Sequence, residues 1–170
     1  MKIPALKKIK EDLQAKYPFI KSIEKDESPT KAVDCNFISV LKNGESGING
    51  EEYQKRVPKN VLGLSQAVWL LEHQDKFPEL KELLGKVYID FPATIVVDAR
   101  GYRDYPCLNR LGKRWTLHWY WIGYGFDSRG RIAVSGKSAT RNLGNLDSSV
   151  FGRLDVLEKK MSKLEKIINL

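Results

Sequence analysis

The chain has 170 residues, of which 42% are hydrophobic and 29% are charged, and its formal net charge is +8. A domain of this length can bury an ordinary core, so disorder is not expected for the body of the chain. Charges interrupt the N-terminal run MKIPALKKIKEDL, and no apolar stretch approaches the roughly 18 residues of a membrane span. We therefore expect a cytoplasmic protein with no secretory signal and no membrane contact.

The first third of the chain predicts a helix followed by a strand. Apolar residues recur at helical spacing between Ile3 and Leu13, which predicts an amphipathic helix over residues 3–17 that Pro18 ends. Residues 32–41 alternate for part of their length and indicate a strand, with a helix as the alternative. The run NGESGING after them has the composition of a loop.

A second helical region follows. Ser65 is a candidate N-cap for a helix over residues 66–77. Pro78 then suits the first position of a further helical turn or two, and Gly85 suits its end. We expect the apolar side chains of these helices to pack against a sheet.

The region from residue 86 onward predicts an antiparallel meander. Three segments share one pattern, with Asp or Asn first and Gly fourth, as in a type I turn that leads into a strand. They are Asp98–Gly101, Asn109–Gly112 and Asp127–Gly130. The strand-like runs between them predict a four-stranded meander with strands near 86–97, 102–108, 113–126 and 131–136.

Two prolines fall within these predicted strands. Pro92 interrupts the first of them, so the hydrogen-bonded ladder is expected to break there. Pro106 falls in the second and is expected at a bulge or on an unpaired edge, because proline has no backbone N–H to donate.

The C-terminal residues predict a separate helix. Leucine, isoleucine and methionine recur at steps of three and four between Leu154 and Ile168, which forms a seam of about two heptads. We therefore predict an α+β fold, with N-terminal helices packed on the meander in a domain over residues 1–150. A C-terminal amphipathic helix over residues 151–170 would dock on that domain or form a homodimer.

Arginine is concentrated in the predicted sheet. Seven of the nine arginines fall between Arg100 and Arg141, and aromatic residues are frequent in the same region. Arginine can grip a phosphate or carboxylate with two N–H groups and can stack on aromatic rings. In a meander Arg100 and Arg129 would share one end of the sheet and could form an anion clamp. The candidate nucleic-acid or anion-binding residues are Arg100, Arg103, Arg110, Arg114, Arg129, Arg131, His118 and Tyr120.

The third predicted strand carries three of the four tryptophans on one face. Residues alternate sides in a strand, so Trp115, Trp119 and Trp121 point the same way, and His118 and Tyr120 point the other way. The tryptophans could be a stacking platform for unpaired bases. We favour their interpretation as sheet core, because large aromatic residues at period two suit a half-buried sheet.

These patterns lead to one expected function and two alternatives. We expect a non-enzymatic protein that binds DNA or RNA through its arginine-rich and aromatic sheet. The first alternative is an interaction module for a protein partner, because Tyr, Trp and Arg are also frequent at protein–protein hot spots. The second is a metal-dependent nuclease that uses Asp90, Asp104 and His118. No motif indicates a cofactor, and the two cysteines, Cys35 and Cys107, have no metal-binding spacing.

Overall fold

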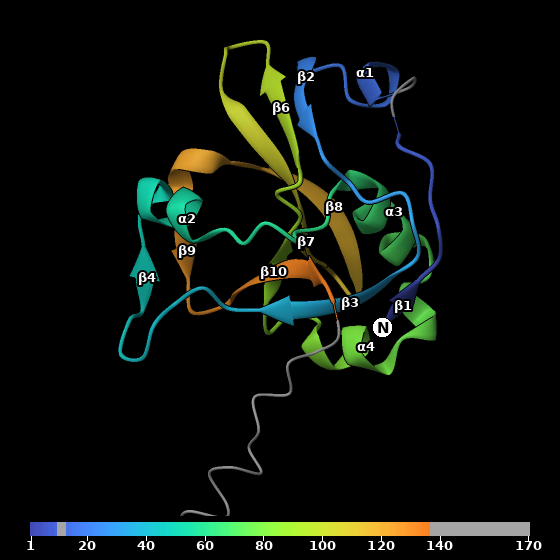
Figure 1. Ribbon diagram of the computed structural model, residues 1–170, viewed down its shortest axis with the longest axis vertical. Helices are drawn as coiled ribbons and strands as arrows, with labels where there is room; N and C mark the ends of the chain where they lie inside the picture. Colours follow the sequence, from blue (N-terminus) through green and yellow to red (C-terminus); the bar gives the residue numbers. More distant parts are fainter. Residues whose placement is uncertain (10–12, 137–170) are drawn as a thin grey trace, which may run out of the picture. The chain divides into compact units, whose positions relative to one another are not determined.

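The computed structural model describes residues 1–9 and 13–136, which lie in one compact unit built mainly of strands (Figure 1). The strands are β1 Lys2–Ile3, β2 Ile20–Asp26, β3 Val33–Ile38, β4 Gly47–Ile48, β5 Tyr88–Asp90, β6 Thr94–Asp98, β7 Arg103–Leu111, β8 Arg114–Trp121, β9 Phe126–Asp127 and β10 Gly130–Ser135. The helices are α1 Leu13–Lys16, α2 Gly50–Arg56, α3 Leu64–Glu72 and α4 Pro78–Leu83, with short 3-10 helices at Gln74–Lys76 and Ile122–Tyr124.

Strand β7 is the centre of the main sheet, whose order is β1-β3-β10-β5-β7-β6-β2. One edge of β7 pairs along its length with β8. The other edge is shared by two strands, because β6 pairs with the start of β7 and β5 pairs with its later part. The sheet therefore divides at β7 into one branch through β6 and β2 and another through β5, β10 and β3.

The division of the sheet coincides with the two prolines. Pro92 lies in the turn between β5 and β6, and the N–H of Phe91 donates to the carbonyl of Pro106 at 2.9 Å. In an antiparallel strand the nitrogen and the carbonyl of one residue point to the same side. The nitrogen of Pro106 therefore faces the gap between β5 and β6, where no strand requires its missing N–H. The predicted break at Pro92 is confirmed, and Pro106 lies at that gap.

The predicted arrangement of N-terminal helices on a meander is wrong. Ile3 is fully buried in β1 and pairs with Val33. Among the described residues of the predicted helix over 3–17, only those of α1 are helical. Pro4 accounts for the start of this difference, because a residue before proline is driven away from helical angles. Strand β2 was not predicted. Its apolar residues Ile20 and Ile23 are three positions apart, and the bulges in its pairing with β6 allow both to pack in the same hydrophobic cluster.

The predicted four-stranded meander is also wrong, although its first three strands are adjacent in the sheet. The first predicted strand corresponds to β5 and β6, the second to β7 and the third to β8. Strand β10 does not pair with β8 but lies between β5, to which it is parallel, and β3, to which it is antiparallel. Between β8 and β10 the chain turns at Gly125, with φ 82°, and forms β9, which pairs with β4. Ile132, Ala133 and Val134 are all buried, as expected for an interior strand.

Several local predictions are confirmed. Residues 32–41 contain β3, Pro78 is the first residue of α4, and Gly85 has φ 79° just after that helix. At Asp98 the predicted turn forms, with the N–H of Gly101 donating to the Asp98 carbonyl at 3.0 Å.

The second predicted turn, at Asn109–Gly112, forms two residues later in the chain. Asn109 pairs with Thr116 within β7 and β8, and Gly112 starts the hairpin turn with φ 62°.

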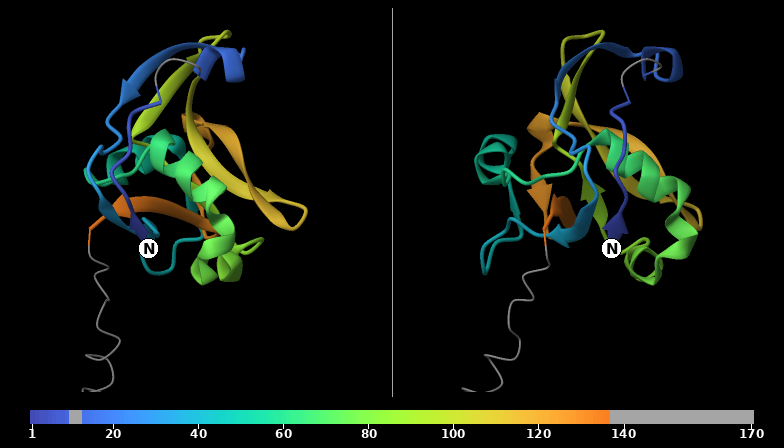
Figure 2. Two further views of the ribbon diagram at one scale, coloured as in Figure 1. Left: turned by 90° about the vertical axis from the view of Figure 1, so that its right-hand side faces the viewer. Right: turned by 45° about the vertical axis from the view of Figure 1, so that its right-hand side comes forward.

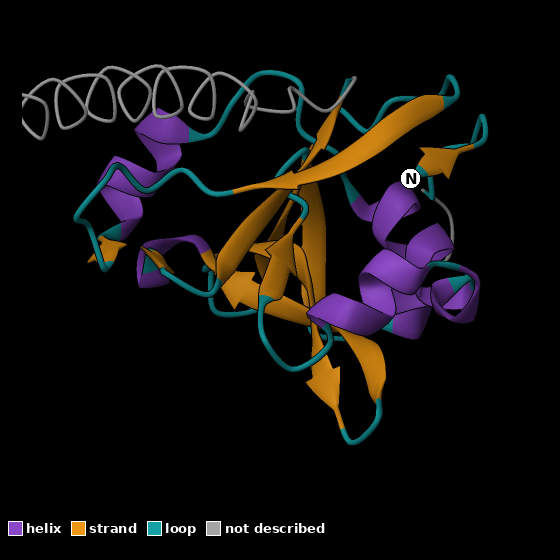
Figure 3. Ribbon diagram, turned by 90° about the horizontal axis from the view of Figure 1, so that it is seen from below, coloured by secondary structure: helices purple, strands orange, loops and turns teal. Residues whose placement is uncertain are grey.

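Helices cover the sheet on opposite sides (Figures 2 and 3). Helix α3 packs one side of the sheet with Leu70, in a core that includes Leu108 and Trp115. Helix α2 packs the other side with Tyr53, next to Tyr105 and Phe126. In the part of the chain that the structure describes, no helix has the length and apolar character needed to cross a membrane. The helix predicted at residues 151–170 lies outside the described residues.

Candidate functional site

The two faces of the β7–β8 hairpin carry different chemistry. On one face Asp104 and Pro106 lie opposite Trp121 and Trp119. On the other face Tyr105 lies opposite Tyr120, and Cys107 lies opposite His118. Each face is covered by helices over part of its length and opens into a hollow near the end of β8.

The tryptophan face passes from core to surface along β8. Trp115 is buried, and its Nε1 donates to the carbonyl of Leu80 at 2.9 Å. Trp119 is half-buried, with Tyr17 and Phe19 meeting its ring edge to face at centroid distances of 5.4 and 6.0 Å. Trp121 is 40% exposed. The favoured interpretation as sheet core therefore holds for Trp115 but not for Trp121, at the other end of this row of tryptophans.

A hollow of about 680 Å³ opens where this stripe reaches the surface, and we call it the aromatic cleft. Its lining residues are Tyr17, Phe19, Asp98, Ala99, Arg100, Asp104, Leu117, His118, Trp119, Trp121 and Tyr124. A smaller hollow of about 270 Å³ adjoins it, lined by Arg100, Tyr102, Asp104, Trp121 and Tyr124. The lining comes from the segment before β2, from both strands of the β6–β7 hairpin, from β8 and from the 3-10 helix after it.

Exposed aromatic rings gather at the mouth of the aromatic cleft. The ring of Tyr102 meets that of Trp121 at 5.6 Å between centroids, and Tyr124 meets Trp121 at 5.4 Å, both edge to face. Tyr102, Trp121, Tyr124 and Phe19 are each at least 40% exposed. Large exposed apolar clusters on a protein surface commonly mark a binding site, so these rings are the first candidate for ligand contact.

Arg100 supplies positive charge beside these rings. Its guanidinium lies over the ring of Tyr102, 5.0 Å from the centroid, and its Nε donates to Asp98 Oδ2 at 2.9 Å. Burial acts to raise the pKa of Asp98, but bonds from the N–H of Tyr102 and from Arg100 outweigh it and lower that pKa. The side chain of Arg100 is 77% exposed, so it remains accessible to an anion.

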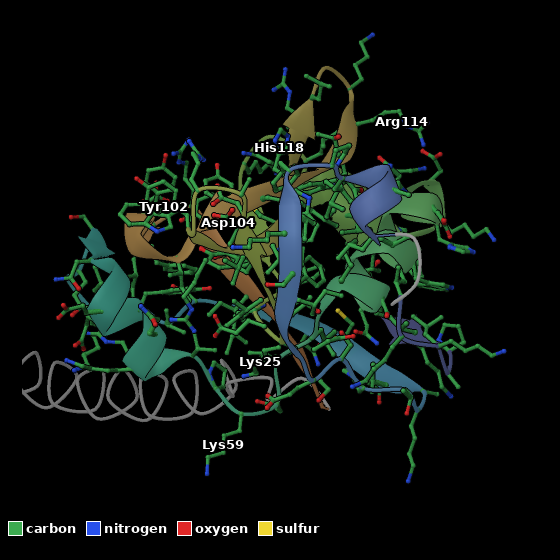
Figure 4. The ribbon with its side chains drawn as sticks, turned by 90° about the horizontal axis from the view of Figure 1, so that it is seen from above. Lys25, Lys59, Tyr102, Asp104, Arg114 and His118 are labelled. Atoms are coloured by element: carbon green, nitrogen blue, oxygen red, sulfur yellow. The ribbon has the colours of Figure 1, made fainter. Side chains whose placement is uncertain are left out.

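Within the described residues of the cleft, the Nε1 of Trp119 is fully buried and has no hydrogen-bond partner. Asp104 also lacks a hydrogen-bond donor, although its carboxylate oxygens are not fully enclosed. Its residue is only 8% exposed, and nothing among residues 1–9 and 13–136 donates a hydrogen bond to its carboxylate. Burial, followed by the nearby charge of Asp98, raises the pKa of Asp104. Figure 4 shows Asp104 and Tyr102 close together, with Arg114 at a distance from both.

A second hollow of about 470 Å³ lies on the other face of the hairpin, and we call it the tyrosine pocket. Its lining residues are Gly47, Ile48, Asn49, Tyr88, Tyr105, Tyr120, Tyr124, Gly125, Phe126, Asp127 and Arg129. The Tyr105 hydroxyl donates to Asp90 Oδ2 at 3.2 Å, as does the Tyr53 hydroxyl at 3.0 Å. Asp90 is fully buried, and this burial raises its pKa to about 7.

The structure does not assemble the predicted anion clamp. Arg100 and Arg129 line different hollows, and each pairs with the aspartate two residues before it, in its own turn. Tyr124 is the residue that lines both hollows. Of the other candidates, His118 lines the aromatic cleft and Tyr120 lines the tyrosine pocket.

The remaining predicted arginines lie outside both hollows. Arg103 makes a two-pronged contact with Glu24, at 2.6 and 2.8 Å. Arg114 contacts Asp75 at 3.1 Å. Arg110 donates to the carbonyl of Gly112, and Arg131 donates to that of Ser128. Their charges contribute to the general field of the protein, but they do not line the site.

The three residues of the nuclease alternative are not brought together. Asp104 and His118 both line the aromatic cleft, whereas Asp90 is buried against the tyrosines on the opposite face of β7. Over the described residues, no group of three or more His, Cys, Asp or Glu side chains is arranged to hold a metal ion. Cys35 and Cys107 are both buried free thiols.

Sequence reasoning missed several lining residues of the aromatic cleft. Tyr17 and Phe19 are absent from the predicted site because they lie outside the predicted strands, and only the fold brings them to β8. Tyr124 lies within the predicted strand 113–126 but was not among the candidates, and the structure places it in the 3-10 helix after β8. Comparison with known proteins gives no significant match, whether to family models, to curated proteins or to solved structures.

Proposed function

We propose that the protein binds unpaired stretches of nucleic acid, without catalysis, through the aromatic cleft. The observation that carries this proposal is the group of exposed rings, Tyr102, Trp121 and Tyr124, beside the accessible guanidinium of Arg100. Every base has an aromatic face, and stacking of one base on such a ring contributes about 1–3 kcal/mol. The guanidinium of Arg100 suits the phosphate that follows a stacked base.

The size and position of the cleft support a base rather than a duplex as its occupant. Its volume of about 680 Å³ lies within the range of roughly 300–1,000 Å³ that is usual for small-ligand sites. The rings are on a strand and its neighbouring turns, and no described helix presents a row of arginines for a major groove. Aromatic faces on a sheet are the usual means of holding splayed single-stranded bases.

Binding should be tested by fluorescence anisotropy with a labelled single-stranded oligonucleotide and with the corresponding duplex. We expect the single strand to bind more tightly, and Trp121→Ala to weaken it about tenfold, because one stacking contact of about 1.4 kcal/mol is lost. Leu111→Ala is the matched control, because Leu111 is an exposed apolar residue outside the cleft. Equal binding by these two variants, or no binding to any single strand, would overturn the proposal.

The same rings would also suit a protein partner, since tyrosine, tryptophan and arginine are enriched at hot spots. The two functions differ in their response to nuclease. A protein partner that is still captured after nuclease treatment, and is lost with Trp121→Ala, would replace nucleic acid as the ligand of the cleft.

A further inference from the structure

Asp104 is an acidic residue of the aromatic cleft that no described residue holds by a hydrogen bond to its carboxylate. Its carboxylate lines both the cleft and the smaller hollow beside Tyr102 and Trp121. It is almost fully buried, yet it accepts no hydrogen bond from any described residue. The carboxylate oxygens are not fully enclosed, so a ligand that donates hydrogen bonds to them replaces water and displaces no protein donor.

The neighbouring charges do not satisfy this carboxylate. Arg100 is the cation nearest to it in the hollow, but the Nε of Arg100 is bonded to Asp98. Asp98 in turn already accepts the backbone N–H groups of Arg100 and Tyr102. Asp98 is thus occupied by its own turn, while Asp104, in the adjacent strand, keeps its acceptor oxygens for a ligand.

An ionised carboxylate can only accept hydrogen bonds, and it can accept two side by side. Guanine presents two adjacent donors on its Watson–Crick edge, N1–H and the N2 amino group. Adenine and cytosine place one amino group beside an acceptor nitrogen, and uracil or thymine places its N–H between two carbonyl groups. Guanine alone therefore offers a complementary pair, while each other base would direct at least one acceptor at the carboxylate.

We propose that the aromatic cleft is selective for guanine, with the base stacked on the exposed rings and the Asp104 carboxylate accepting hydrogen bonds from its N1–H and N2 amino group. This inference rests on the proposed function, because it requires a base in the cleft. A cationic side chain of a protein would be a competing partner for Asp104 among aromatic rings. The guanidinium of Arg100 in the same hollow disfavours a second cation and favours a ligand that carries phosphate.

The first experiment changes the ligand and leaves the protein intact. Labelled single strands that differ at one central position, occupied by guanine, inosine, adenine or cytosine, are compared by anisotropy. We expect guanine to bind at least about tenfold more tightly than adenine, as one well-formed pair of hydrogen bonds provides. Inosine lacks the N2 amino group, so it should fall between the two.

The second experiment changes the carboxylate. Asp104→Asn replaces one acceptor by a donor, so the preference for guanine over adenine should fall to within about threefold while the adenine strand still binds. Asp75→Asn removes an exposed carboxylate outside the cleft and should leave the preference unchanged. Far-ultraviolet circular dichroism and thermal unfolding establish that both variants are folded, and the inosine comparison remains decisive if Asp104→Asn is not.

Each outcome has a separate meaning. Equal affinity for all four strands, with binding that still depends on Trp121, would overturn the guanine inference and leave the proposed function in place. Absence of binding to every strand would overturn both. Displacement of the guanine strand by a trimethyl-lysine peptide at lower concentration than by free guanosine monophosphate would assign Asp104 to a cationic ligand instead.

Discussion

The indole of Trp121 and the ring of Tyr124 meet edge to face, with centroids 5.4 Å apart and planes at 81°. This contact depends on Gly123, which lies just before Tyr124 and has no side chain. A Cβ on Gly123 would lie only 2.5 and 2.6 Å from Cζ2 and Cη2 of Trp121. The position of the exposed indole is therefore set by the absence of a side chain at residue 123.

Gly123→Ala should weaken single-strand binding without unfolding the protein. The added methyl group displaces the end of one exposed side chain and no backbone atom, so the free energy of unfolding should change by about 1 kcal/mol or less. Affinity should fall towards that of Trp121→Ala. Urea denaturation and anisotropy measure the two effects, and an affinity equal to the wild type would show that the orientation of Trp121 is irrelevant to binding.

Arg100 should account for part of the salt dependence of binding. For a single strand, each phosphate contact contributes about 0.7 to the slope of log affinity against log salt concentration. Arg100→Ala should reduce that slope by about this amount. Arg114→Ala is the control, since it removes another exposed arginine, also paired with an aspartate, that lies outside both hollows. Equal slopes for the two variants would mean that Arg100 contacts no phosphate.

The two ends of the tryptophan stripe should respond differently to truncation. Trp115→Ala removes a buried ring and its hydrogen bond to Leu80, and should lower the free energy of unfolding by about 3–5 kcal/mol. Trp121→Ala removes a side chain that is 40% exposed, and should lower it by about 1 kcal/mol. Urea denaturation of both variants tests this gradient, which would be contradicted by equal losses.

Asp90 should make the stability of the protein depend on pH. Burial raises its pKa to about 7 in the folded state, from an unfolded value near 4. Between those values the unfolded chain loses a proton that the folded chain keeps, so the free energy of unfolding should fall as pH rises from about 4 to 7. Above pH 7 the loss of stability from Asp90 is complete, and below pH 4 Asp90 no longer makes the free energy of unfolding depend on pH.

Asp90→Asn tests this assignment. The amide oxygen can still accept from the hydroxyl groups of Tyr53 and Tyr105, and it has no charge to desolvate. We expect the variant to be more stable than the wild type at pH 8 and to lack this fall between pH 4 and 7. Unfolding curves at several pH values provide the measurement, and an unchanged pH profile would exclude Asp90 as its source.

The sequence predicted several elements but not their order in the sheet. Local patterns were sufficient for the strands around Ile89, Tyr105 and Leu117, and for the helix that begins at Pro78. The position of β10 was not predictable from local patterns, because it depends on pairing with β3, almost 100 residues earlier in the chain. Strand β2 was missed because its bulges remove the period-two pattern.

The site was only partly predictable for a related reason. Arg100 and Arg129 were identified correctly as turn residues, but each turn also supplies the aspartate that pairs with its arginine. The D-x-R spacing in both turns could have indicated that pairing. No local signal marks Phe19 as a neighbour of Trp119, because the two residues are 100 positions apart and meet only in the folded chain. Tyr124 is close to Trp121 in the sequence, but the predicted strand over residues 113–126 does not contain the 3-10 turn that brings their rings into contact.

Pro106 has a consequence for which side of the sheet faces the ligand. A shift of β7 by one residue would exchange its two faces, placing Tyr105 where Asp104 now lies. The same shift would also direct the proline nitrogen at β8, where a ladder hydrogen bond would be lost. In the observed register that nitrogen faces the gap between β5 and β6. A residue that contributes no donor therefore fixes the register, and with it the side on which the Asp104 carboxylate is presented.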